Sequence, residues 1–322
     1  MFPIRFASLA VGLAVSMLAQ GAAAQAWPTK PIRLVVPFSA GGANDLMARA
    51  AAEGASKQLG QPVIVDNKPG AGAILGADVV AKSAPDGYTF LVSAAGVVSN
   101  SMIKKSMPYK DDALVPVAMI ALAPSVIVVP ANAPYKDLKE FVAASKKAGS
   151  GFHWATAGTG STPHFVEGIL ETKYGSKLDV VPYKSGSESI TAVLGSQVEA
   201  TSEASIVVLP YVKSGKLKAL AGTWTQRISA YPDLPTAAEE GFPEIRIAHW
   251  AGVHAPRGTP DAIMDKMAAA IDAAMKAPAT VERLKGMGIE PIGGTRASFT
   301  RFVEEERARL GGVVKATGMK ED

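Results

Sequence analysis

The stretch from Pro31 to Arg49 constrains the fold of this chain more than any other. Residues 32–36 form a short apolar run, rich in β-branched side chains and bounded by prolines, which predicts a buried strand. Apolar residues then recur at helical spacing from Leu46 to residue 59, so a strand gives way to a helix across residues 38–42, Phe-Ser-Ala-Gly-Gly. Glycine lets a ligand approach the main chain, and the first amides of a helix lack partners within it. This turn therefore predicts an anion-binding site suited to phosphates or carboxylates.

The alternation of strand and helix continues after this turn. Strands are predicted at residues 63–65 and 88–93, with a helix at residues 73–83 between them. The order βαβαβ with ordinary connections predicts a parallel sheet with helices on both faces, in which ligands bind beyond the carboxyl ends of the strands. We expect residues 94–123 to form a less regular connection, because prolines and the pair Asp111-Asp112 interrupt the pattern.

A second alternating series begins near residue 125. Its glycine-rich turn, residues 157–161 with the sequence Ala-Gly-Thr-Gly-Ser, opens a helix that runs from Pro163 to about Tyr174. The other expected strands are residues 125–129, 153–156, 180–183, 198–201, 217–222 and 246–253, and the other expected helices are residues 134–147, 188–194, 206–214, a short one ending at 241, 261–276, 281–287 and 298–316.

The length and the two series predict two α/β lobes. A chain of 322 residues that is 48% apolar can bury two medium-sized cores. We expect residues 27–125 and 248–322 to form the first lobe and residues 126–247 the second, with a ligand cleft between them.

The N-terminal residues 1–26 are predicted to be a secretory signal peptide. Arg5 supplies the positive start, residues 6–18 the apolar region, and small residues before Ala24 or Ala26 the cleavage pattern. No later segment reaches the roughly 20 apolar residues of a membrane-spanning helix, and the chain contains no cysteine. The mature protein is therefore expected in the periplasm, without disulfides.

Composition excludes several kinds of partner. A net charge of +4, spread along the chain, indicates a solvated surface and no nucleic-acid partner. The four histidines, at positions 153, 164, 249 and 254, have no metal-binding spacing, so we expect neither a metal nor a cofactor.

The candidate ligand-binding residues lie in or near the two glycine turns and at later strand ends: Phe38, Ser39, Gly41, Gly42, Asp45, Ala94, Thr156, Gly158, Thr159, Gly160, Ser161, His164, Tyr183 and Glu203. Most of them have a structural alternative. The glycines and Ser39 could serve only a tight turn, the hydroxyls could cap a helix, and Phe38 could be a core residue. Asp45 could complement the helix dipole, orient the loop amides or meet a ligand amine, and His164 could be packed or on the surface.

An ordered series of short motifs resembles one known family. The series comprises residues 37–49 (PFSAGGANDLMAR), 65–72 (VDNKPGAG), 83–89 (SAPDGYT), 157–161 (AGTGS) with His164, 181–184 (VPYK), 215–221 (GKLKALA), 232–236 (PDLPT) with Glu239 and Gly241, and 250–252 (WAG) with Ala255-Pro256. In this order they resemble the periplasmic receptors of tripartite tricarboxylate transporters, called the Bug or TctC family. The resemblance covers essentially the whole mature chain.

The resemblance implies a two-lobed type II periplasmic-binding-protein fold that closes on an organic carboxylate and docks as a monomer on integral membrane transporter subunits. It also implies that residues 38–42 and 156–161 bind the ligand's carboxylates through amides, hydroxyls and ordered waters. Two features depart from the family pattern: Ser185-Gly186-Ser187-Glu188 after the Pro-Tyr-Lys of residues 182–184, and Glu203 in a usually apolar or aromatic region. If Glu203 faces the cleft, an amine- or hydroxyl-bearing ligand is favoured over a purely anionic one.

Two other functions remain open at the level of sequence. An exported hydrolase would need a nucleophile with a positioned base, and the chain has neither a Gly-x-Ser-x-Gly elbow nor a phosphate-binding loop with its lysine. A ligand-sensing partner of a membrane signalling protein would use the same pocket and differ only in what it docks onto. We therefore expect a binding protein and not an enzyme.

Overall fold

The computed structural model describes residues 27–183 and 185–320, so the predicted signal peptide lies outside the described residues. The strands are β1 (Ile32–Val36), β2 (Val63–Asn67), β3 (Thr89–Ser93), β4 (Leu114–Pro130), β5 (His153–Thr156), β6 (Asp179–Pro182), β7 (Ala200–Ala204), β8 (Leu217–Gly222), β9 (Ala248–Pro256) and β10 (Glu290–Pro291). The helices are α2 (Ala43–Leu59), α3 (Ile74–Ala81), α4 (Ala95–Ile103), α5 (Leu138–Ala148), α6 (Thr162–Tyr174), α7 (Gly186–Leu194), α8 (Ser205–Lys213), α9 (Asp261–Lys276), α10 (Pro278–Gly286) and α11 (Arg296–Thr317), with 3-10 turns η1 (Ala71–Ala73) and η2 (Asp111–Ala113).

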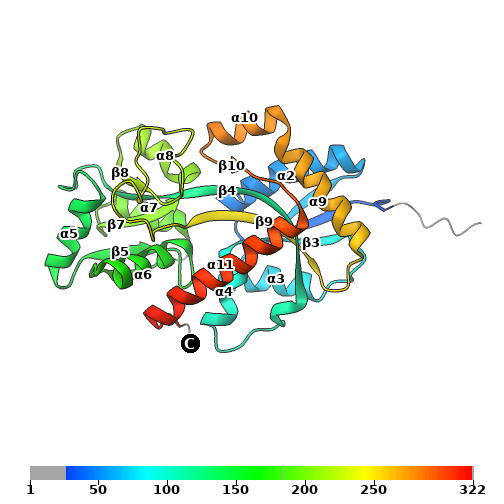
Figure 1. The fold of residues 1–322 in the computed structure, drawn as a ribbon, viewed down its shortest axis with the longest axis horizontal. Helices are drawn as coiled ribbons and strands as arrows, with labels where there is room; N and C mark the ends of the chain where they lie inside the picture. The colour runs from blue at the N-terminus through cyan, green and yellow to red at the C-terminus, as the bar shows by residue number, and fades with distance from the viewer. Residues whose placement is uncertain (1–26, 184, 321–322) are drawn as a thin grey trace, which may run out of the picture.

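Two parallel groups of strands are joined by two antiparallel strands. The sheet has the order β2-β1-β3-β9-β4-β7-β5-β6, with β8 and β10 also paired to β4. β2, β1 and β3 are mutually parallel, as are β6, β5 and β7, which confirms the parallel pairing expected within each series. β4 and β9 are antiparallel to each other and run from one group to the other, as Figure 1 shows.

The prediction for residues 94–123 was wrong. The segment forms α4, η2 and the first part of β4, a strand of 17 residues that continues to residue 130. Prolines normally interrupt a ladder, but here the register shifts between Pro116 and Ala118 and again between Met119 and Ala121. These irregularities let β4 continue through a segment whose prolines had indicated a connection.

The remaining element predictions were close, with one further correction. Residues 231–241 form turns and no helix, since Pro232 and Pro235 interrupt the segment; Thr236 instead bridges to Gly222 at the end of β8. β7 extends to Ala204 and β9 to Pro256, beyond the expected ends of these strands.

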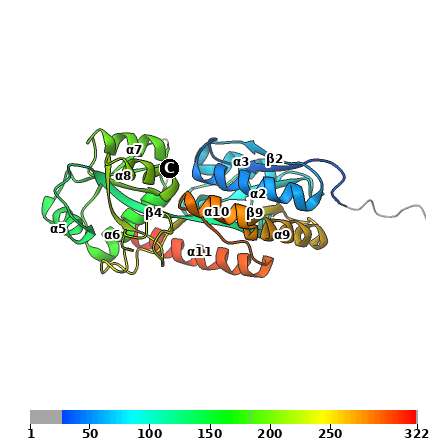
Figure 2. The same ribbon diagram turned by 90° about the horizontal axis from the view of Figure 1, so that it is seen from above.

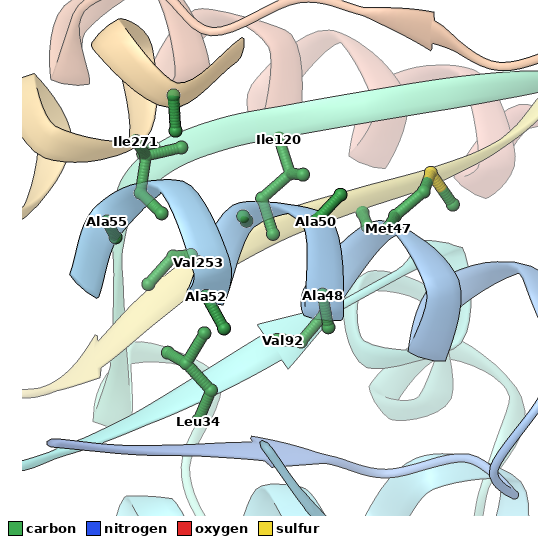
Figure 3. Close-up of a cluster of buried hydrophobic side chains, with 14 of the residues drawn as sticks. Leu34, Met47, Ala48, Ala50, Ala52, Ala55, Val92, Ile120, Val253 and Ile271 are labelled. Atoms are coloured by element: carbon green, nitrogen blue, oxygen red, sulfur yellow. The ribbon is translucent and has the colours of Figure 1, made fainter. Parts of the chain in front are cut away.

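Two large buried clusters form most of the core, one mainly in the first half of the molecule and one that extends from the second half into the first. In the first cluster, the alanine-rich α2 packs against the sheet and against α9, which also contacts β4 of the sheet (Figure 3). A Cβ atom added at Gly54 would lie 2.3 Å from the Cβ of Ala274, so glycine is what lets α2 and α9 approach so closely. The second cluster contains the fully buried Trp154 and Phe165 and includes residues of α4 and α11. α11 contacts both α4 and α6 and thus lies along both halves (Figures 1 and 2).

The strand register makes the carboxyl ends of the two parallel groups point toward each other. Ser93, the last residue of β3, lies opposite Gly252, which lies opposite Met119 of β4. Ala204, the last residue of β7, lies opposite Ser125 of β4. β3 runs in the same direction as β4, and β7 runs in the opposite direction to β4. The carboxyl ends of β3 and β7 therefore face each other across the six-residue step from Met119 to Ser125 of β4, roughly 20 Å of strand.

Candidate functional site

Four helices begin at these facing strand ends. α2 and α4 follow β1 and β3 on one side, and α6 and α8 follow β5 and β7 on the other. No side chain caps the first turn of any of the four, whereas Ser185 caps α7. Backbone amides without intrahelical partners thus converge on the region between the halves. This arrangement can hold an anion from two sides.

The first glycine turn is held by a buried carboxylate. Asp45 Oδ2 accepts hydrogen bonds from Gly41 N and Arg49 Nε, both at 2.9 Å, and Oδ1 accepts one from Asn67 Nδ2 at 2.9 Å. Asn67 also donates to the carbonyl of Phe38 at 3.1 Å. Burial raises the pKa of Asp45, but the hydrogen bonds from Arg49, Gly41 and Asn67 outweigh it, so the pKa is lowered and the carboxylate stays ionised.

Asp45 therefore acts on the loop. Its side chain is only 2% exposed, and both of its oxygens accept hydrogen bonds from protein groups. Of the three roles that the sequence left open for Asp45, these contacts match the orientation of the loop amides. Ser39 and Gly41 are exposed at the turn, Gly42 is half-buried, and Phe38 packs against the core cluster of the first half.

The second glycine turn is held by its own serine and histidine. Ser161 Oγ donates to the carbonyl of Gly158 at 2.6 Å and does not cap α6. Gly160 N donates to His164 Nδ1 at 3.2 Å, and burial lowers the pKa of His164, which favours the neutral ring that accepts this bond. Gly160 has φ +74°, and a Cβ atom there would lie 2.8 Å from Ile103 Cδ1, so this turn sits directly against α4.

The other predicted residues surround the same strand ends. Thr156 ends β5; its carbonyl accepts from Tyr183 N at 2.8 Å and from Ser189 Oγ at 3.0 Å, while its own buried hydroxyl has no protein partner. Thr159 and Tyr183 are half-buried. Ala94 is the buried residue that precedes the first turn of α4.

Glu203 lies near the end of β7, in the region where β4 and β9 join the two halves. Its side chain is 6% exposed, and Oε2 is 3.8 Å from His249 Nε2 of β9. Burial raises the pKa of Glu203 to about 8 and lowers that of His249 to about 4, so both are neutral near pH 7.

Sequence reasoning missed the residues that connect and support the loops. Asn67 and Arg49 lie inside motifs that were singled out, but their roles depend on pairing of β1 with β2. Asn44 Nδ2 donates to the carbonyl of Trp250 at 2.9 Å and so ties the start of α2 to β9. The sequence signal for it was an amide residue at the start of a predicted helix, next to a glycine turn.

Residues 27–183 and 185–320 contain neither a metal-binding cluster nor a helix that could cross a membrane. This part of the chain holds no group of three or more metal-ligating side chains. Within the same residues, none of the helices has the length and apolar character needed to cross a membrane.

Comparison with known proteins decides the family. Residues 47–319 match the family described as "Tripartite tricarboxylate transporter family receptor". The chain belongs to this family. The resemblance noted in the sequence is thereby confirmed.

Solved structures of relatives have the same fold. The periplasmic binding protein BugD is 31% identical, with a TM-score of 0.82 over 92% of this chain and 100% of its own. Rpa4515 of R. palustris with adipate is 31% identical (TM-score 0.84; 91% and 98% covered), and MatC of Rhodopseudomonas palustris with bound malate is 30% identical (TM-score 0.79; 89% and 100% covered). The receptor thus has the two-lobed α/β fold of periplasmic binding proteins, as predicted, and belongs to a family of solute-binding proteins.

Proposed function

We propose that this receptor captures a small organic carboxylate between its lobes in the periplasm and delivers it to integral membrane subunits of a tripartite transporter. The observation that carries the proposal is the convergence of uncapped helix starts from both halves on one region, with two supported glycine turns. The bound adipate and malate of the two relatives support the ligand class. We also propose that the receptor is exported to the periplasm and works as a monomer.

The ligand contacts are assigned to both sides of the region. The amides of residues 39–42 and of the first turn of α2, together with Ala94 at α4, serve the first lobe (residues 27–125 and 248–322). The turn 156–161, with Thr159, Ser161 and Tyr183, serves the second lobe (residues 126–247). Because only the closed arrangement brings both sets to one ligand, binding favours the closed state. Asp45 and His164 act by positioning the amides.

The second glycine turn gives no support to the hydrolase alternative. Ser161 Oγ donates to Gly158 O, and His164 Nδ1 accepts from Gly160 N, so neither contact joins a serine nucleophile to a histidine base. The sensing alternative involves the same pocket and differs in the docking partner.

Calorimetric titration with a panel of carboxylates tests the proposal. The panel contains succinate, glutarate and adipate, the 2-hydroxy and 2-amino derivative of each, and a set of monocarboxylates and aromatic acids. We expect at least one member to bind with a 1:1 stoichiometry and to raise the melting temperature. If none binds, the carboxylate receptor is refuted; if ester or phosphate substrates are hydrolysed and Ser161→Ala abolishes this, the enzyme takes its place.

A further inference from the structure

One buried carboxyl group is not accounted for by the binding of an anion. Glu203 has an oxygen, Oε1, that is buried without a hydrogen-bond partner. Such a group is costly in a folded protein unless a ligand or function uses it. The other oxygen, Oε2, faces His249 at 3.8 Å.

The position of Glu203 is where ligand-binding elements of both lobes meet. Glu203 pairs with Val126 of β4, next to the point where β7 ends and α8 begins. The following residue, Ala204, belongs to the core cluster against which Phe38 of the first turn also packs. Glu203 thus lies one residue before this contact of the second lobe with the first, with its side chain on the opposite face of β7 from that of Ala204.

Glycine at position 186 leaves the space that this carboxyl group occupies. A Cβ atom added at Gly186 would lie 2.6 Å from Glu203 Oε2 and 2.7 Å from Oε1. The start of α7 therefore closes over the carboxyl group from one side. The two departures from the family pattern, at residues 185–188 and at Glu203, are parts of one feature.

Burial raises the pKa of Glu203 and outweighs the hydrogen bond that the backbone N–H of Ala204 donates to its carboxyl group, which lowers the pKa. β9 contributes His249, and β4 contributes Ser125, whose Oγ lies 3.4 Å from His249 Nε2. The first turn of α8 has no charged residue, and Glu188 of α7 is exposed. Among the described residues, His249 is thus the titratable side chain recorded within 4 Å of the carboxyl group, and burial keeps it neutral.

From this geometry we propose that Glu203 is a specificity-determining residue, which selects carboxylate ligands that also carry an ammonium or hydroxyl group. The free Oε1 accepts a hydrogen bond from that group. The inference rests on the proposed carboxylate-binding function and adds the chemistry of the second contact. A ligand with carboxylates alone gains nothing from Glu203.

An ammonium group has a further consequence at neutral pH. Burial raises the pKa of Glu203 to about 8, so the group is mostly protonated at pH 7. A cation placed at Oε1 favours the ionised form, so binding of an ammonium-bearing ligand displaces this proton. Affinity for such a ligand therefore rises with pH between 6 and 8, whereas affinity for a hydroxyl-bearing or plain dicarboxylate does not follow this dependence.

The test compares matched ligands on matched variants. The wild type, Glu203→Leu and Glu203→Gln are titrated with the carbon skeleton that binds tightest in the carboxylate panel, in its plain, 2-hydroxy and 2-amino forms. In the wild type we expect a donor-bearing form to bind at least about tenfold tighter than the plain form, which corresponds to one hydrogen bond to a charged or strongly polar group. In Glu203→Leu the preference disappears while the plain form binds as before.

Two readouts separate this role from a structural one. Glu203→Leu removes a buried carboxyl group whose Oε1 has no hydrogen-bond partner, so its melting temperature is expected to stay at or above that of the wild type. Titrations of the 2-amino form at pH 7 in two buffers of different ionisation enthalpy report proton release. The wild type is expected to release close to one proton and Glu203→Gln, which keeps the side-chain volume, to release none.

Three outcomes would overturn the inference. They are equal affinity of the wild type for plain and donor-bearing forms, a preference that survives in Glu203→Leu, and binding of the 2-amino form without proton release. Each leaves the carboxylate receptor intact. Failure of every carboxylate in the panel refutes the proposed function itself and the inference with it.

Discussion

The network around Asp45 gives the sharpest prediction about the candidate site. Replacing Asp45 by asparagine keeps the size of the side chain but changes one of its two accepting oxygens into a donor. In the wild type, three donors bond to the Asp45 carboxylate, each at 2.9 Å: Gly41 N, Arg49 Nε and Asn67 Nδ2. In Asp45→Asn, at least one of these donors faces the new NH2 group, which is also a donor, in a site that is almost fully buried.

The magnitude follows from the number and kind of bonds. A hydrogen bond to a charged group contributes about 1.5–3 kcal/mol, and breaking a buried charged network costs about 3–5 kcal/mol. We expect Asp45→Asn to lower the free energy of unfolding by about 2–4 kcal/mol and, for a chain of this length, the melting temperature by about 3–6 °C. Release of the Gly41 turn should also weaken carboxylate binding by about tenfold or more, or roughly 1.4 kcal/mol.

The assay has a control in the same helix and a defined pH range. Glu53→Gln removes an exposed partner of Lys57 and Arg283 and is expected to change the melting temperature little. The pKa of Asp45 is lowered by folding from 3.8, so its stabilisation is complete above that value and is lost as the pH falls through the folded-state pKa. The difference between wild type and Asp45→Asn should therefore be constant from pH 5 to 8 and shrink below about pH 4. If Asp45→Asn is as stable as Glu53→Gln and binds ligand normally, the supporting role of Asp45 is refuted.

Other predictions concern close approaches in the fold. Gly160→Ala should lower the free energy of unfolding by about 1–3 kcal/mol, because the new Cβ would meet Ile103. Gly149→Ala, which has a similar positive φ but open space around it, should lower this free energy less. Equal melting temperatures of the two variants would contradict the contact of the second glycine turn with α4. Gly54→Ala should lower the free energy of unfolding by about 1–3 kcal/mol, because the new Cβ pushes α2 away from Ala274. Gly286→Ala, whose new Cβ meets nothing within 4 Å, should show no such loss in thermal denaturation.

Local sequence signals were sufficient to locate the two glycine turns and the helices that follow them. Short strand-like segments before glycine and helical periodicity after it are properties of a few consecutive residues, and they placed β1, α2, β5 and α6 correctly. The motif series was also enough to recognise the family, because its elements occur in a fixed order.

Long-range pairing could not be predicted in the same way. The 17-residue β4 was only partly recognised, since its prolines indicate a break unless the register shifts with β9 are known. The supporting role of Asp45 depends on Asn67, which pairing of β1 with β2 brings alongside. Likewise, Glu203 and His249 meet only because β7 and β9 both pair with β4.

The most direct test of the account is a crystal structure of the receptor with the tightest-binding carboxylate of the panel. We predict that the ligand lies between the lobes, with a carboxylate within hydrogen-bond distance of backbone amides at residues 39–45 and contacts to the turn 156–161 on the opposite side. A ligand bound elsewhere, for example in the hollow lined by Leu46, Arg49 and Met287 between α2 and α10, would contradict the account.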